Sequence, residues 1–156
     1  MKTVDYEALS AQACALIHEV PHFVSNLANL SALLFHSLEK LNWAGFYLLE
    51  GEILVLGPFQ GKPACIEIPL GKGVCGTAAR EDRTIVVPDV HQFEGHIACD
   101  SDSASEIVIP FHRGGKLIGV LDIDSPIKAR FDEGDRRGLE GFVRAVEAEI
   151  DAGGRG

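Results

Sequence analysis

The hydrophobic positions in the first quarter of the chain recur every three or four residues, which predicts two helices. Asp5 can cap the first helix, which we expect to run to about Val20, because Pro21 follows and cannot continue it. Its predicted apolar face consists of Leu9, Ala13, Leu16 and Ile17. A second helix is predicted from Phe23 to about Lys40. Its predicted apolar stripe consists of Leu27, Leu30, Leu34 and Leu38. The N-terminal helices should therefore occupy about residues 5–40.

The pattern then changes to short apolar runs separated by glycine, which is typical of strands. WAGFYLLE and EILVLGPF flank Gly51 and predict one hairpin, while EIVIPFHR and KLIGVLDIDS flank Gly114–Gly115 and predict a second. ACIEIPL and TIVVPDV predict two further short strands, and a glycine-rich turn with a short helix over 71–82 lies between them. Asp132 can cap a terminal helix over about 131–150.

Hairpins pair neighbouring strands antiparallel, so the predicted fold class is α+β. We expect a single domain over residues 1–156, in which a mainly antiparallel central sheet carries helices packed mostly on one face. The sheet and a ligand pocket should lie within about residues 42–126. The segment 89–105 is long for a loop in a compact domain, and such loops are often functional.

Composition and charge exclude several classes of function. A chain of 156 residues can bury a core without a stabilising disulfide or metal. The net charge of −9 and the absence of a long basic run argue against a nucleic-acid partner. No apolar run is long enough to cross a membrane, and MKTVDYEALSAQ lacks the apolar core of a signal peptide, so we expect a cytoplasmic protein. Four cysteines in that compartment indicate catalysis, redox cycling or metal binding.

The cysteines lie in different surroundings. Cys75 lies near the start of the short helix, where the helix dipole lowers a thiol pKa, so the residues alone favour Cys75 as a nucleophile. Cys99 lies in HIACDSDSASEI, where Asp100 and Asp102 should oppose a thiolate and are expected to be solvated. Cys14 has apolar neighbours and is interpreted as a core residue.

Three acids and two aromatic residues accompany these thiols. Asp122 and Asp124 are two positions apart on a predicted strand and should share one face, while Glu106 begins the partner strand in a register that the sequence does not give. Carboxylic acids that are buried together can stay protonated near neutral pH. Trp43 and Tyr47 should also share a face, although the residues alone favour ordinary core packing for both. The backbone N–H groups of the turn 71–73 could bind a substrate carboxylate.

The segments IPLGKGVCGTAAR, IVVPDV, SEIVIPF and GKLIGVLDIDS resemble the GAF domain family over about residues 40–150. The three thiols at Cys65, Cys75 and Cys99 narrow the resemblance to the free methionine-(R)-sulfoxide reductases. LNWAGFYL, GKPACIEIPLGKGVCGTAA, HIACDSDSASEIVIP and GVLDIDSP are similar to that family. Sensor GAF domains have no chemical reason to carry all three thiols.

The resemblance implies reduction of free L-methionine-(R)-sulfoxide to L-methionine, with no bound cofactor and no metal. It implies that Cys99 attacks the sulfoxide sulfur, Cys65 resolves the resulting sulfenic acid as a disulfide, and Cys75 is an auxiliary thiol. An external dithiol such as thioredoxin would then reduce the disulfide. The implied substrate-binding residues are Glu106, Asp122, Asp124, Trp43 and Tyr47.

The sequence leaves three alternative functions and one possible oligomeric state open. A non-catalytic GAF sensor would bind a small ligand without turnover, but it usually carries a fused output domain, for which 156 residues leave no room. A zinc site could use His91, His96 and Cys99, although no C-x2-C pair supports it. A redox-sensing thiol protein would share the disulfide but have no dedicated substrate. A homodimer could form if the first and terminal helices pair across a two-fold axis.

Overall fold

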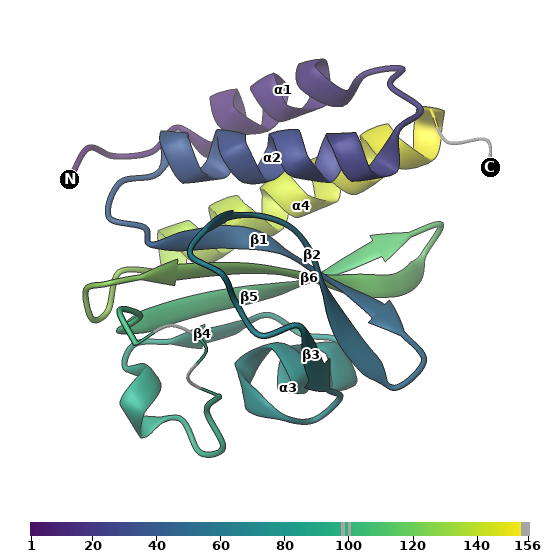
Figure 1. Cartoon of the computed structure of the whole chain (residues 1–156). Helices are drawn as coiled ribbons and strands as arrows, with labels where there is room; N and C mark the ends of the chain where they lie inside the picture. The colour runs from purple at the N-terminus through teal and green to yellow at the C-terminus, as the bar shows by residue number, and fades with distance from the viewer. Residues whose placement is uncertain (98, 100, 154–156) are drawn as a thin grey trace.

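One antiparallel sheet of six strands forms the centre of the molecule (Figure 1). A computed structural model describes residues 1–97, 99 and 101–153. The strands follow the order β3-β2-β1-β6-β5-β4 across the sheet, and each neighbouring pair is antiparallel. The strands are β1 (Trp43–Glu50), β2 (Ile53–Gly61), β3 (Glu67–Pro69), β4 (Ile85–Val87), β5 (Ser105–Arg113) and β6 (Lys116–Ser125). The predicted α+β fold and both predicted hairpins are confirmed.

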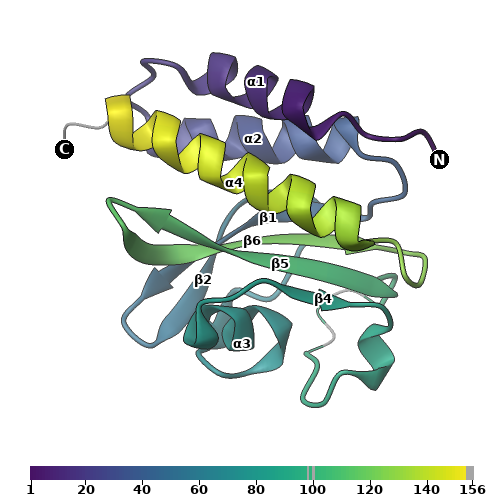
Figure 2. The same ribbon diagram turned by 180° about the vertical axis from the view of Figure 1, so that it is seen from behind.

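Helices cover the two faces of this sheet unequally, as Figures 1 and 2 show from opposite sides. Three helices form a layer on one face, and the shorter α3 lies on the other. The helices are α1 (Tyr6–Ile17), α2 (Phe23–Ser37), α3 (Gly73–Glu81) and α4 (Glu133–Gly153). The larger hydrophobic core lies under the three-helix layer and includes Leu27, Leu30 and Phe142, which are almost completely buried. The prediction that helices pack mostly on one face is therefore confirmed.

Side-chain caps fix the starts of α1 and α4. Asp5 accepts a hydrogen bond from the Ala8 N–H at 3.0 Å, and Asp132 accepts one from the Asp135 N–H at 2.8 Å. The first helix ends at Ile17 and not near Val20.

The predicted apolar face of α1 is wrong at one position. Leu9, Ala13 and Ile17 are buried at a spacing of four residues, but Leu16 is 43% exposed. Because α2 and α4 pack against α1, they bury only the residues that face them, and Leu16 lies beyond that contact. Periodicity alone cannot show how wide the buried face of a helix is. The second helix likewise ends at Ser37 rather than Lys40, although Leu38 beyond its end stays buried.

The second hydrophobic core lies on the α3 face of the sheet and positions the candidate site. It packs Val108 and Val120 from the central strands against Val74, Ala78 and Ala79 from α3. The segment 89–105 lies on this same side and contains one short 3-10 helix, η1 (Val90–Gln92). The long segment and α3 therefore flank the same face of β5 and β6.

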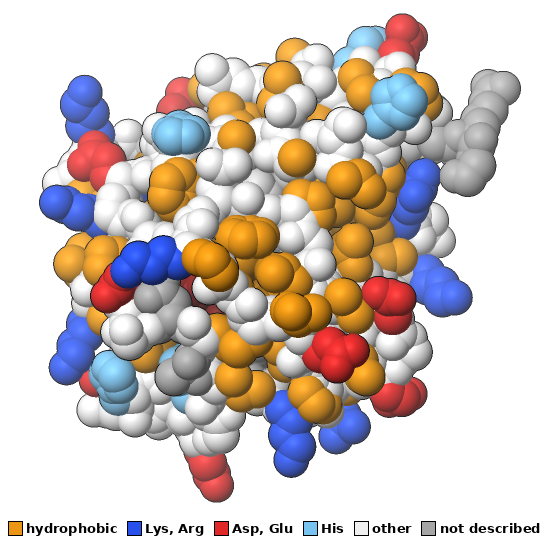
Figure 3. Space-filling model, in the orientation of Figure 1, with side chains coloured by type: hydrophobic (Ala, Val, Ile, Leu, Met, Phe, Trp, Pro, Cys, Tyr) orange, Lys and Arg blue, Asp and Glu red, His pale blue; other side chains and the backbone are white. Residues whose placement is uncertain are grey.

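The molecular surface shows no concentration of positive charge in the view of Figure 3. Lys and Arg side chains are mostly spread around the outline, and hydrophobic side chains gather across the centre. Within the described residues, no helix has both the length and the apolar character needed to cross a membrane.

Candidate active site

A cavity opens on the α3 face of the sheet and brings the predicted site residues together. It contains about 510 Å³ of empty space, part of which is continuous with solvent. The predicted residues that line it are Trp43, Tyr47, Cys75, Cys99, Glu106, Asp122 and Asp124. Cys65, the remaining predicted residue, is joined to this wall through its bond to Cys99.

Strand register explains how the three acids meet. Glu106 on β5 lies directly opposite Asp124 on β6, and Trp43 on β1 lies opposite Asp124 from the other side. These three residues therefore form one row across three strands. Asp122 is two residues from Asp124 and points to the same face, as alternation along a strand requires. The pairing supplies the register that the sequence alone does not give.

All three acids are buried, and this changes the chemistry of at least two of them. The exposed fractions of Glu106, Asp122 and Asp124 are 6%, 5% and 8%. Burial raises the pKa of Glu106 well above its usual range, and the nearby charge of Asp122 raises it further. Burial likewise raises the pKa of Asp122, with the charge of Asp124 adding to the effect. Burial therefore favours the protonated forms of Glu106 and Asp122, in which a carboxylic acid can donate a proton.

The first turn of α3 contains Cys75, but the helix dipole does not activate this thiol. Cys75 is 5% exposed, and its Sγ lies 4.0 Å from Oε2 of Glu106, to which the thiol donates. Burial raises the pKa of Cys75 well above its usual value, and the charges of Asp122 and Glu106 raise it further. The expectation that the helix N-terminus lowers this pKa is wrong, because desolvation and three nearby acids outweigh the dipole.

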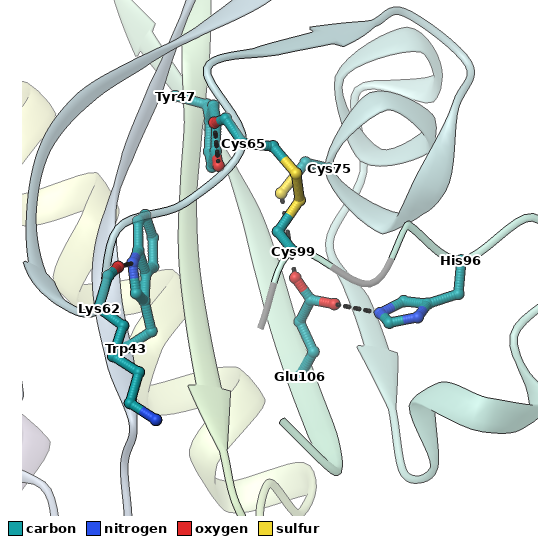
Figure 4. The surroundings of a disulfide bond; sticks show 8 residues. All are labelled: Trp43, Tyr47, Lys62, Cys65, Cys75, His96, Cys99 and Glu106. Atoms are coloured by element: carbon teal, nitrogen blue, oxygen red, sulfur yellow. Dashed lines mark hydrogen bonds and ion pairs between the residues drawn. A yellow bond between two sulfur atoms is a disulfide. The ribbon is translucent and has the colours of Figure 1, made fainter. Parts of the chain in front are cut away.

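The sulfur atoms of Cys65 and Cys99 form a disulfide, which lies above Glu106 in Figure 4. The two Cα atoms are 5.4 Å apart, a separation that suits a disulfide. Cys14 and Cys75 are free thiols. Cys14 is half-buried on α1 and donates to the Ala145 carbonyl, so it lies in the helical layer and outside the cavity.

The two aromatic residues hold the segment that carries Cys65. Trp43 and Tyr47 are both 2% exposed, and their rings stack with centroids 5.8 Å apart. The Tyr47 hydroxyl donates to the Cys65 carbonyl at 2.8 Å, and Trp43 Nε1 donates to the Lys62 carbonyl at 3.1 Å (Figure 4). The sequence predicts these rings only as pocket walls, whereas the structure also gives them polar contacts that fix one cysteine over the cavity.

A histidine on the Cys99 segment points toward Glu106. Nε2 of His96 lies 4.0 Å from Oε1 of Glu106, and Figure 4 shows the ring pointing toward that carboxyl. Burial lowers the pKa of His96, and the charge of His91 adds to this effect. His96 is therefore a neutral imidazole at the cavity wall. The sequence suggests His96 only as a zinc ligand, although its position three residues before Cys99 indicates that it could lie near the cavity.

The zinc alternative and one anion-binding expectation do not match the geometry. His91 is exposed on η1, and the sulfur of Cys99 is occupied by the disulfide, so these residues do not form a zinc site with His96. In the turn 71–73, the N–H of Gly71 donates to Gly76 and that of Lys72 donates to Pro69. Those two groups are therefore not available to a substrate carboxylate.

Polar contacts also anchor the other end of the Cys99 segment. Asp102 forms an ion pair with Lys62 at the surface, and Ser103 accepts a hydrogen bond from the Asn42 side chain at 3.0 Å. Asp102, expected to be solvated, is half-exposed and paired. Asp100, for which the same expectation was made, lies outside the described residues.

Known proteins resemble this chain along nearly its whole length. Residues 5–150 match the GAF domain family. The chain is 51% identical over 146 residues to the free methionine-R-sulfoxide reductase of Escherichia coli, covering 94% of this chain and 88% of that protein. The structure of fRMsr of Staphylococcus aureus in complex with substrate has a TM-score of 0.90 at 54% identity, covering 96% of this chain and 98% of the other. That of free methionine-R-sulfoxide reductase from Neisseria meningitidis, in complex with its substrate, has a TM-score of 0.90 at 40% identity, covering 98% and 95%.

Proposed function

Because this chain belongs to the free methionine-R-sulfoxide reductases of the GAF domain family, we propose that it reduces free L-methionine-(R)-sulfoxide to L-methionine in the cavity beside the disulfide. The chain is thus an oxidoreductase. One observation supports the proposal most: a pair of cysteines bonded to each other lies next to buried acids whose pKa values are raised. That combination supplies both a sulfur nucleophile and protons for the oxygen that must leave.

In the first step, the Cys99 sulfur attacks the electrophilic sulfur of the sulfoxide. The sulfoxide oxygen is a poor leaving group until it is protonated, and Glu106 and Asp122 are the neutral acids in the cavity that can donate to it. As a bond forms between the Cys99 sulfur and the substrate sulfur, the S–O bond breaks and the protonated oxygen leaves as water. Water then attacks the Cys99 sulfur, so that the sulfur–sulfur bond breaks, methionine leaves with its electron pair, and Cys99 becomes a sulfenic acid. In net terms, one thiol and one sulfoxide give one sulfenic acid and one sulfide.

In the second step, the Cys65 thiol attacks the sulfenic acid of Cys99. A sulfur–sulfur bond forms, and the hydroxyl leaves as water after taking up a proton. The 5.4 Å Cα separation and the hydrogen bond from Tyr47 to the Cys65 carbonyl support this step, because they place the two sulfurs within bonding range. On this proposal, the structure with its disulfide corresponds to the oxidised end of the cycle.

In the third step, an external dithiol reduces the disulfide by thiol exchange and is itself oxidised. We propose thioredoxin for this role, with no bound cofactor or metal required. Cys75 is proposed as an auxiliary thiol, since it lies close to the disulfide but has a strongly raised pKa.

A free amino acid also presents an ammonium and a carboxylate. We propose that Asp124, the third buried acid, binds the ammonium group, and that Trp43 and Tyr47 pack against the S-methyl end. Since the N–H groups of Gly71 and Lys72 are already bonded, the first turn of α3 at Gly73 and Val74 is the proposed place for the carboxylate.

The test is a coupled assay in which thioredoxin, its reductase and NADPH report turnover. Free methionine-(R)-sulfoxide should support NADPH oxidation, while the S epimer and peptide-bound sulfoxide should not. Equal rates with both epimers would contradict the specific proposal. Saturable binding of the sulfoxide with no turnover at all would support a GAF sensor instead.

A further inference from the structure

We propose that the thiol of Cys75 and the carboxyl groups of Glu106 and Asp122 also form a site for one soft divalent cation of the zinc class. This site is distinct from the zinc alternative built on the histidines of the long segment. It is not required for the reductase chemistry, and its ligands are not the two cysteines of the disulfide. Bound metal would occupy the acids that the proposed function assigns to the sulfoxide oxygen, so it would inhibit.

The donor atoms are close enough for one ion to reach all of them. One ligand atom from each of the three residues lies within 4.8 Å of the other two, and all three side chains are buried. Zinc bonds of about 2.0–2.3 Å in tetrahedral geometry place ligand atoms about 3.3–3.8 Å apart. The side chains therefore need to close in by up to about 1.5 Å. Thiolate and carboxylate are both ordinary zinc ligands.

An unsatisfied polar atom independently indicates a ligand at this point. Asp122 is 5% exposed and lines the cavity, yet its Oδ1 has no hydrogen-bond partner among the described residues. Buried carboxyl oxygens are normally satisfied, so an orphaned one facing a cavity calls for an explanation. A cation bound here would fill this position, and the thiol and the carboxyl groups would give up their protons to become its ligands.

The donor atoms of the cluster also select the kind of metal. A thiolate sulfur favours zinc over calcium or magnesium, which prefer oxygen ligands alone. His96 lies on the side of the Glu106 carboxyl away from Cys75 in Figure 4 and is not a member of this three-residue cluster.

The disulfide allows metal binding by Cys75 to be tested separately from the other cysteines. The chain has four cysteines, and with Cys65 and Cys99 oxidised only Cys14 and Cys75 remain as thiols. In oxidised Cys14→Ser protein, Cys75 is therefore the only thiol. Titration with Co²⁺ should produce the near-ultraviolet charge-transfer absorption of a cobalt–thiolate bond at one equivalent, and Zn²⁺ should abolish it by displacement.

Two further variants in this background assign the ligands. Cys75→Ser should abolish the absorption, and Asp122→Asn should weaken Co²⁺ binding at least about tenfold, since each removes a ligand. Glu67→Gln, at an exposed acid on β3, is the matched control and should bind as before. Circular dichroism of every variant checks that the fold is kept.

The outcomes separate this proposal from the proposed function. Absence of the charge-transfer band in folded Cys14→Ser protein, or its persistence after Cys75→Ser, would overturn the cation site whatever the turnover assay shows. Free methionine sulfoxide should raise the Co²⁺ concentration needed for half-saturation. If it does not, inhibition by overlap with the sulfoxide site is refuted.

Discussion

Replacing the buried Glu106 with glutamine should make the protein more stable at neutral pH and nearly inactive. Glutamine keeps the size and hydrogen-bonding capacity of the side chain but has no titrating proton. The raised pKa means that the folded protein holds a proton on Glu106 which the unfolded chain, with its pKa near 4.5, releases. The native state is therefore penalised by this side chain at pH values above 4.5.

The sign and size of the effect follow from proton linkage. Below pH 4.5 both states are protonated, so the group contributes no pH dependence. Above pH 4.5 the unfolded chain binds fewer protons than the folded protein, and the free energy of unfolding falls as pH rises. The fall is about 1.4 kcal/mol per pH unit for one group and continues until the pH reaches the folded pKa. Glu106→Gln removes the part of this pH dependence of the free energy of unfolding that comes from Glu106.

The assay is urea denaturation of the disulfide-intact protein at several pH values between 5 and 8. The stability of Glu106→Gln relative to the unaltered protein should grow as the pH rises through that window, by at most about 1.4 kcal/mol per pH unit. Glu67→Gln, at an exposed acid, is the control and should follow the unaltered protein. Identical slopes for Glu106→Gln and the unaltered protein would refute a neutral buried acid. In turnover, loss of the proton donor should lower kcat by about 10²–10⁴-fold.

Three further substitutions test the chemistry, the electrostatics and the packing. The Cys65→Ser variant should release one methionine per chain but should not be recycled by thioredoxin, and the amount of methionine formed per chain measures this. Full turnover by the variant would overturn the resolving role of Cys65. Although burial opposes charge on His112, hydrogen bonds to one carboxylate at the end of α3 and one on α4 raise its pKa. His112→Gln should thus lower the free energy of unfolding by about 1 kcal/mol below pH 6. In denaturation curves at higher pH, this difference should shrink as the histidine loses its proton. Gly119→Ala should cost about 1–3 kcal/mol or more, since a Cβ there would lie 2.1 Å from the Tyr47 carbonyl oxygen on the neighbouring strand; an unchanged melting temperature would contradict this.

Local patterns in the sequence predict most of the fold because each element carries its own signal. Asp5 and Asp132 cap helices as predicted, and Gly51 and Gly114–Gly115 lie in the turns of the two hairpins. The errors come from contacts between elements. Leu16 is apolar and correctly spaced, but the neighbouring helices leave it exposed.

Alternation along a strand predicts that Asp122 and Asp124 share a face, but only strand pairing places Glu106 opposite Asp124. The pKa of Cys75 is mispredicted for the same reason. The helix start is visible in the sequence, whereas burial and the three acids brought to it by β5 and β6 are properties of the folded chain. His96 likewise joins the site only because the long segment folds back over the sheet.

The central claim is that Cys99 reduces the sulfoxide and Cys65 alone resolves it. Fully reduced protein should be mixed with one equivalent of free methionine-(R)-sulfoxide without any external reductant, then alkylated and mapped by mass spectrometry. We expect one methionine per chain, a disulfide between Cys65 and Cys99, and Cys14 and Cys75 recovered as alkylated thiols. Methionine formed together with a disulfide to Cys75, or no methionine at all, would contradict it.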